Sequence, residues 1–133
     1  MFSTTIKITF YDADPAGIMF FGNAFKYAHS AYEELIEGSP YKKTFFSNEK
    51  FVVPIVHTEA DYLRPLYPNT ILRIEVSAGE IRESSFELNY RLSDENQQEC
   101  VRVRTVHVFV DKVSWKKASI PADLKAFLEN LQD

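Results

Sequence analysis

The sequence predicts an α+β domain of two layers, in which one long helix packs against an antiparallel sheet. An alternating apolar segment at residues 4–10 precedes one long amphipathic segment that ends at Glu37. Further alternating segments then follow one another between residues 52 and 110, with turn-forming residues between them. Consecutive strands of this kind pair antiparallel, and a helix can cover one face of the resulting sheet.

Composition favours a single folded domain over residues 1–133, because the chain is 133 residues long and 45% hydrophobic. The net charge of −4 argues against nucleic-acid or membrane partners that require a positive field. The single cysteine, Cys100, excludes an intrachain disulfide, and it has no Cys/His cluster beside it that would indicate a metal site. Without a signal-like or membrane-spanning segment, we expect a cytoplasmic protein.

The first strand is expected over residues 4–10, where Ile6, Ile8 and Phe10 alternate with polar residues. It must stop near Asp14, because the following proline lacks a backbone donor and Gly17 permits a tight turn.

The long helix is expected from Phe20 or Phe21 to Glu37, ending at Gly38. At 100° per residue its apolar positions form one arc, with His29 at the margin of that arc. The arc contains Phe25, Ala28, Ala31, Tyr32, Leu35 and Ile36.

The second half of the chain reads as strands joined by turns. Residues 39–50 are expected to form a loop, and residues 93–99 a hairpin tip. Pro54 predicts an edge strand or a bulge, and Pro121 suits the first position of a short terminal helix. The expected strands are residues 52–63, 70–78, 84–92 and 100–110.

An acidic turn between the first strand and the helix is the strongest candidate for chemistry. It lies in residues 10–25, FYDADPAGIMFFGNAF, and carries Asp12 and Asp14. Aspartate is common in turns and helix caps, where it satisfies backbone donors, so the spacing alone favours a structural role for both residues over a catalytic one.

The run DADPAGIMFFGNAFKYAHSAYEEL resembles the signature of the hotdog-fold acyl-CoA thioesterases of the 4-hydroxybenzoyl-CoA thioesterase class. The resemblance implies a single hotdog domain, a long central helix packed on a curved antiparallel β-sheet. It implies that Asp14 is the catalytic carboxylate, either nucleophile or general base, and that Gly17 forms its turn. It also implies that the backbone N–H of Phe21 polarises the thioester carbonyl, which suits the donors at a helix start.

The same resemblance suggests residues that contact substrate, namely His29, His57, Asn23 and Arg82. The segments PIVH and HSAYEE resemble segments of the 1,4-dihydroxy-2-naphthoyl-CoA thioesterases. The basic cluster that contacts coenzyme A phosphates in the 4-hydroxybenzoyl-CoA enzyme is reduced in this chain to Arg82. The alternative for His29 and His57 is a structural role, in which the ring forms its hydrogen bonds within the core or at an interface. His107 is expected to be structural.

The resemblance therefore implies hydrolysis of an aromatic acyl-CoA, with no metal and no cofactor because coenzyme A is part of the substrate. It also implies a homodimer or homotetramer with the active site at a subunit interface. A thioesterase for short or medium aliphatic acyl-CoAs and a non-catalytic hotdog binding protein remain the alternatives.

Overall fold

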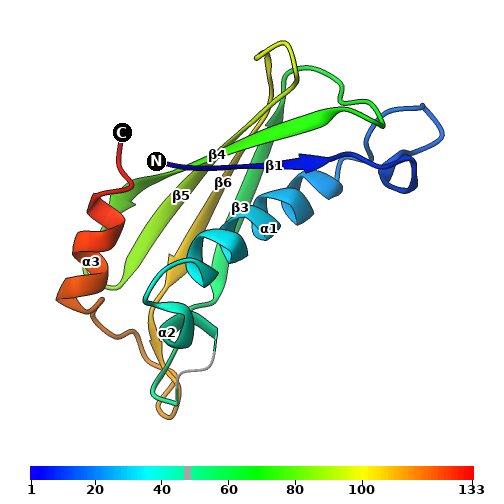
Figure 1. Ribbon diagram of the computed structural model, residues 1–133. Coiled ribbons are helices and arrows are strands. Elements are labelled where there is room, and N and C mark those ends of the chain that lie inside the picture. Colours follow the sequence, from blue (N-terminus) through cyan, green and yellow to red (C-terminus); the bar gives the residue numbers. More distant parts are fainter. Residues whose placement is uncertain (47–48) are drawn as a thin grey trace.

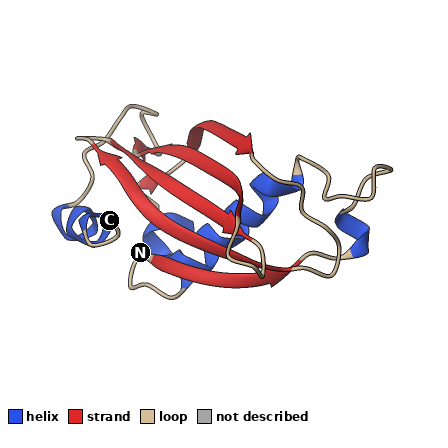
Figure 2. Ribbon diagram, turned by 90° about the horizontal axis from the view of Figure 1, so that it is seen from above, coloured by secondary structure: helices blue, strands red, loops and turns tan. Residues whose placement is uncertain are grey.

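A long helix lying along one face of a curved antiparallel sheet organises the fold (Figures 1 and 2). The computed structural model describes residues 1–46 and 49–133. Its elements are β1 (Phe2–Lys7), the 3-10 turn η1 (Phe10–Asp12), α1 (Asn23–Glu37), α2 (Lys42–Phe46), β2 (Phe51–Val52), β3 (Ile55–Tyr62), β4 (Ile71–Ile81), β5 (Ser85–Ser93), β6 (Glu99–Val108), β7 (Val110–Asp111) and α3 (Ala122–Glu129).

The main sheet has the strand order β1-β4-β5-β6-β3, and every neighbouring pair is antiparallel. Strands β1 and β3 form its two edges, and the short strands β2 and β7 pair separately. This arrangement confirms the predicted α+β domain with a central helix on an antiparallel sheet. None of the helices in the described residues combines the length and the apolar character needed to cross a bilayer.

The first strand ends earlier than its alternation predicts. β1 stops at Lys7, and the chain turns at η1, where the Asp12 N–H donates to the Thr9 carbonyl at 3.1 Å. Phe10 was expected on the buried side of a strand, but it is 82% exposed. The predicted end of the first strand was wrong, because alternation of apolar residues does not detect a turn formed by backbone hydrogen bonds.

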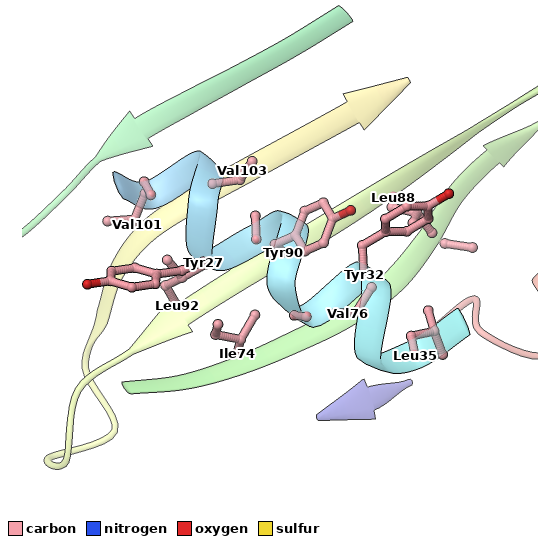
Figure 3. Close-up of a cluster of buried hydrophobic side chains, with 14 of the residues drawn as sticks. Tyr27, Tyr32, Leu35, Ile74, Val76, Leu88, Tyr90, Leu92, Val101 and Val103 are labelled. Carbon is pink, nitrogen blue, oxygen red and sulfur yellow. The ribbon is translucent and has the colours of Figure 1, made fainter. Parts of the chain in front are cut away.

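The long helix begins at Asn23, two or three residues later than predicted, and ends at Glu37 before Gly38 as expected. The residues before it form a β-turn, because the Asn23 N–H donates to the Phe20 carbonyl at 3.0 Å. Its apolar face packs on β4, β5 and β6, as Figure 3 shows. The buried residues of this face are Ala24, Tyr27, Ala28, Ala31, Tyr32, Leu35 and Ile36.

The later elements follow the predicted order with local differences. The expected loop at 39–50 contains the short helix α2, and its residues 47–48 lie outside the described part of the chain. Pro54 separates β2 from β3, which is both an edge strand and bulged near Ile55, so both expectations from this proline are confirmed. The last long strand breaks at Phe109 before β7, and Pro121 directly precedes α3.

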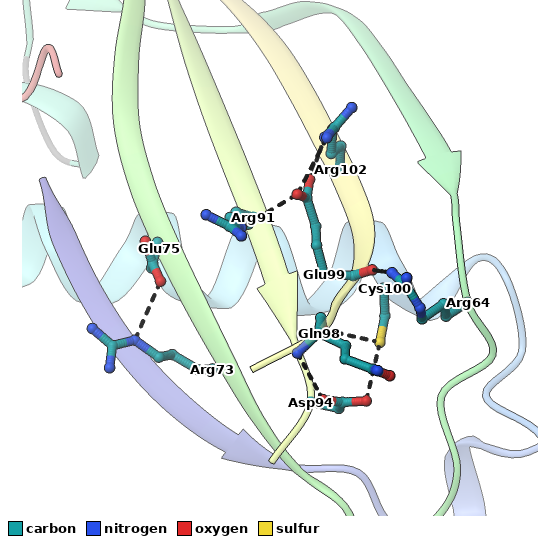
Figure 4. A network of polar contacts seen from close by, with 9 residues as sticks. All are labelled: Arg64, Arg73, Glu75, Arg91, Asp94, Gln98, Glu99, Cys100 and Arg102. Atoms are coloured by element: carbon teal, nitrogen blue, oxygen red, sulfur yellow. Dashed lines mark hydrogen bonds and ion pairs between the residues drawn. The ribbon is translucent and has the colours of Figure 1, made fainter. Parts of the chain in front are cut away.

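The face of the sheet that points away from α1 carries ion pairs (Figure 4). Arg91 and Arg102 both contact the Glu99 carboxylate, and Arg73 lies 3.4 Å from Glu75. Such exposed pairs contribute little to stability individually. They keep this face polar, so the apolar core forms only on the α1 side.

His107 is buried in that core, which confirms its expected structural role. Its Nε2 lies 2.8 Å from the Thr105 hydroxyl, which donates to Tyr90, and its ring stacks on Phe86. Its Nδ1 has no partner in the described chain, so a second ring proton would be buried without an acceptor. Burial, assisted by the field of His29, lowers the pKa of His107 to about 3.

We therefore expect His107 to make the protein sensitive to acid. A histidine in the unfolded chain has a pKa near 6.5, so the unfolded state binds one more proton than the folded state between about pH 3 and 6.5. The free energy of unfolding should fall by about 1.4 kcal/mol for each pH unit below 6.5 from this group alone. Its stabilising contribution is complete above pH 6.5 and is lost as pH falls toward 3.

Denaturant titrations between about pH 5 and pH 6.5 measure this slope before most carboxylates titrate. The His107→Gln variant should take up about one proton fewer on unfolding. Equal slopes for the wild type and His107→Gln would contradict a neutral buried imidazole.

Candidate active site

The turn that carries Asp14 is held by its own backbone and by contact with a neighbouring loop. The Asp14 N–H donates to the Ile18 carbonyl at 2.9 Å, and the Met19 N–H donates to the Leu66 carbonyl at 2.7 Å. The Oδ1 of Asp14 accepts the Ala16 N–H at 2.8 Å. Among the described residues no group donates to its Oδ2, so one carboxylate oxygen is available to a ligand.

Gly17 closes this turn in a conformation that suits glycine. Its φ is +79°, and its N–H donates to the Asp14 carbonyl at 2.9 Å. A side chain there would meet no neighbouring atom, so the demand for glycine comes from the backbone conformation alone. The predicted tight turn at Gly17 is therefore confirmed, and Gly17 contributes shape to the site.

Phe21 lies in the β-turn that leads into α1. The Phe20 carbonyl points toward the helix, because it accepts the Asn23 N–H. A trans peptide places its N–H opposite its C=O, so the Phe21 N–H points away from α1. It donates to no acceptor in the described chain, and it is a free donor next to a helix N-terminus.

Asp14 and Phe21 line the same pocket, which has a volume of about 390 Å³. Its other wall comes from the end of β3 and the segment that follows that strand. The remaining lining residues are Ile18, Met19, Tyr62, Leu63, Arg64, Pro65, Leu66 and Val101. The walls are mainly apolar, and Asp14 and Phe21, whose N–H is free, belong to the same lining.

Tyr62 was not singled out from the sequence, and it lines this pocket together with Arg64. The Tyr62 hydroxyl donates to the Phe21 carbonyl at 2.6 Å, which ties the β-turn to the edge strand. Burial raises the pKa of Tyr62, so it remains a neutral donor. Arg64 donates to the Glu99 carbonyl at 2.8 Å, and it is a cation in a pocket that also holds Asp14. Tyr62 and Arg64 are far from Asp14 in sequence, and no local motif marks them.

Asn23 and Asp12 are not among the described residues that line the pocket. The Asn23 side-chain amide donates to the Asp12 carbonyl at 3.0 Å, so in this chain the predicted substrate ligand holds the turn. Asp12 was expected to be a turn residue, and it does lie in η1. Its carboxylate is buried, and the Tyr27 hydroxyl donates to it at 2.5 Å.

The structure does not bring the other predicted substrate residues to this pocket within one chain. The His29 side chain is 50% exposed on α1 and lies 3.1 Å from Glu33, so the expected burial at the margin of the apolar arc is only partial. His57 lies on β3 and is 3.6 Å from Glu59. Arg82 pairs with Glu80 in the β4–β5 turn, at the opposite end of the sheet from the Asp14 turn (Figure 1).

Within residues 1–46 and 49–133, no three His, Cys, Asp or Glu side chains gather closely enough to hold a metal ion. The pocket offers the Asp14 carboxylate, the free Phe21 N–H, the Tyr62 hydroxyl and the Arg64 guanidinium. A carboxylate and a free donor in one pocket suit attack on a carbonyl whose oxygen becomes negative.

Comparisons with known proteins place this geometry in a family. Residues 8–128 match the model of the thioesterase-like superfamily. The chain is 33% identical to the 1,4-dihydroxy-2-naphthoyl-CoA hydrolase of Nostoc punctiforme, covering 96% of this chain and 86% of that protein. It is 34% identical to the enzyme of the same name from Synechococcus elongatus, covering 95% and 93%.

Solved structures share this fold. The 1,4-dihydroxy-2-naphthoyl-CoA thioesterase of Synechocystis superimposes with a TM-score of 0.86 at 25% identity, covering 98% of this chain and 96% of that one. The structure of BH1999, a gentisyl-coenzyme A thioesterase, superimposes with a TM-score of 0.81 at 20% identity, covering 96% and 99%. At that identity it supports the fold alone.

Proposed function

This chain belongs to the thioesterase-like superfamily, and from that membership we propose that it hydrolyses an aromatic acyl-CoA to the free acid and coenzyme A. The observation that carries the proposal is the pocket shared by the Asp14 carboxylate and the Phe21 N–H. The relatives that match over nearly the whole chain are named as hydrolases of one such thioester, 1,4-dihydroxy-2-naphthoyl-CoA.

In the proposed reaction, the thioester carbonyl lies between these two groups. The Phe21 N–H donates to the carbonyl oxygen and stabilises the negative charge that develops there. Asp14 acts on the carbonyl carbon, either directly to give a mixed anhydride or by deprotonating a water that attacks it. In both routes the C–S bond breaks, coenzyme A leaves as a thiolate, and water supplies the second oxygen of the free acid.

The reaction proposed here requires no cofactor, because coenzyme A enters as part of the substrate. A thiolate is a weakly basic leaving group, so the site needs no strong general acid beside the sulfur. This matches the lining formed by the described residues, in which Asp14 is the one carboxylate and no histidine takes part.

An aromatic acyl group suits the apolar walls of the pocket. Phe21 and Tyr62 provide aromatic surfaces, with ring centroids 6.4 Å apart in an edge-on arrangement. Flat rings bind well against such surfaces. The pocket volume of about 390 Å³ lies within the usual range for small-molecule sites.

A panel of acyl-CoAs tests this function through release of free thiol by the purified protein. We expect kcat/KM for 1,4-dihydroxy-2-naphthoyl-CoA or 4-hydroxybenzoyl-CoA to exceed that for octanoyl-CoA by at least about tenfold. Faster hydrolysis of octanoyl-CoA would favour an aliphatic thioesterase. Binding without thiol release from any member would favour a non-catalytic binding protein.

We further propose that the chain works as a homodimer, or as a pair of such dimers, that closes this pocket. β3 is an edge strand with one partner, and apolar side chains are exposed along it, including Val56 at 59% and Tyr62 at 46%. Exposed apolar edge strands readily pair with another chain. Since Tyr62 also lines the pocket, a second copy on this edge would cover the open side of the site.

A proline in the edge strand should prevent this pairing. The Leu63 N–H donates to Cys100 in β6, so by strand alternation the Thr58 N–H points away from β6. Thr58→Pro therefore removes an outward donor without removing a β3–β6 hydrogen bond. We expect light scattering to give the mass of a monomer for Thr58→Pro and of a dimer or tetramer for wild type and Thr58→Val. An unchanged mass for Thr58→Pro would contradict pairing through β3.

A further inference from the structure

The proposed reaction does not use Asp12, although its carboxylate is one of the few buried charges in the described chain. The side chain is 7% exposed. Its oxygens accept the Tyr27 hydroxyl at 2.5 Å, the Thr9 hydroxyl at 3.2 Å and the Lys26 ammonium at 3.3 Å. A buried carboxylate with three donors holds its neighbours in a defined arrangement.

The backbone of the same residue is engaged as well. The Asp12 carbonyl accepts the Phe20 N–H at 2.8 Å and the Asn23 side-chain amide at 3.0 Å. Tyr27 and Asn23 belong to α1, whereas Phe20 belongs to the β-turn before it. Asp12 thus joins η1, the β-turn and α1 through both its side chain and its carbonyl.

Both proposed catalytic groups lie close in sequence to residues of the Asp12 junction. Asp14 follows Asp12 by two residues, and Phe21 follows Phe20 by one. The carboxylate and the free N–H therefore lie on two segments that meet at Asp12. A shift at this junction would change the distance between them, and reactions at such sites are sensitive to displacements of about 1 Å.

Asp12 remains ionised at this junction. The hydrogen bond from Tyr27 holds the pKa of the Asp12 carboxyl below its ordinary value, with further contributions from Lys26 and Thr9 against the cost of burial. Burial and the Asp12 charge together raise the pKa of Tyr27. Near neutral pH the pair is a carboxylate and a neutral phenol, so the hydrogen bond has a fixed direction.

We propose that Asp12 and Tyr27 act as a positioning pair that sets the Asp14 carboxylate against the Phe21 N–H. This role rests on the proposed hydrolysis. It differs from a purely structural role, in which loss of the pair would lower stability while folded molecules kept their turnover rate. A positioning role predicts that folded molecules turn over more slowly while still binding substrate.

Single and double variants separate these roles. For Tyr27→Phe and for Asp12→Asn we expect kcat to fall about 10- to 100-fold while KM changes by less than about threefold. The kcat of the double variant should lie within about threefold of the kcat of the slower single variant, because the two residues act as one unit. Thermal unfolding at the assay temperature identifies any variant that is not folded, and Tyr27→Phe, the milder change, then carries the test.

A matched control accompanies these variants. Tyr90→Phe also removes a buried tyrosine hydroxyl, but from the sheet. It should keep kcat within about threefold of wild type. A wild-type kcat in folded Tyr27→Phe and Asp12→Asn would overturn the positioning role while leaving the hydrolysis intact.

Hydrogen exchange provides a readout that does not need turnover. The Phe20 N–H, which donates to Asp12, should exchange at least about tenfold faster in Tyr27→Phe than in wild type or Tyr90→Phe. If the wild type releases no thiol, the hydrolysis fails and this exchange still reports on the junction. Unchanged exchange at Phe20 would show that Tyr27 does not hold the junction, and it would overturn the proposal.

Discussion

Replacing Asp14 by asparagine is expected to lower kcat for aromatic acyl-CoA hydrolysis by about 10²- to 10⁴-fold. Asparagine has nearly the same shape, and its Oδ1 can still accept the Ala16 N–H that Asp14 accepts at 2.8 Å. It can neither attack a carbonyl as an anion nor take a proton from water. The loss should therefore appear in the chemical step while the turn keeps its structure.

Three measurements on Asp14→Asn make this result specific. Free-thiol release gives kcat, thermal unfolding tests the fold, and light scattering tests the assembly. Asp123→Asn is the matched control, because it neutralises an exposed carboxylate in α3 at the other end of the sheet (Figure 1). A kcat within about threefold of wild type in Asp14→Asn would remove Asp14 from the chemistry.

Replacing Phe21 by proline is the second substitution with a large expected effect, because it deletes the proposed oxyanion donor. Phe21 is the second residue of the β-turn from Phe20 to Asn23, a position that favours proline. Gly22 has φ −65° and ψ −21°, which is within about 25° of the ideal angles for the third residue of a type I turn. The turn can therefore accept proline, and we expect kcat to fall about 10²- to 10³-fold.

Phe21→Leu is the control for this experiment, because it alters the side chain and keeps the N–H. We expect Phe21→Leu to keep most of the wild-type kcat and to change mainly KM, since the side chain lines the pocket. Equal losses of kcat in Phe21→Leu and Phe21→Pro would assign the effect to the aromatic ring. That outcome would exclude the backbone donor.

The fold could be predicted largely from periodicity. The apolar arc of α1 and the alternation in β4 and β5 depend on burying one face, which the sequence records directly. The end of β1 and the start of α1 could not be located, because backbone hydrogen bonds at Thr9 and Phe20 determine them. β3 was predicted to alternate between two faces, yet nearly all of it is exposed in the single chain.

The site was predictable only where it is continuous in sequence. Asp14, Gly17 and Phe21 lie in one motif, and the structure places Asp14 and Phe21 in one pocket. Tyr62 and Arg64 reach that pocket because β3 pairs with β6, a contact that local sequence does not encode. His29, His57 and Arg82 lie elsewhere in the chain, so their predicted contact with substrate depends on a second subunit.

A crystal structure with a non-hydrolysable analogue of 1,4-dihydroxy-2-naphthoyl-CoA tests the central claim most directly. We expect the oxygen that replaces the thioester carbonyl oxygen to lie about 2.7–3.1 Å from the Phe21 nitrogen. The carbon bearing it should face the Asp14 carboxylate, directly or through one water, with the acyl ring against the Phe21 and Tyr62 side chains. An analogue whose carbonyl lies outside this pocket, or points away from both groups, would contradict the proposed active site.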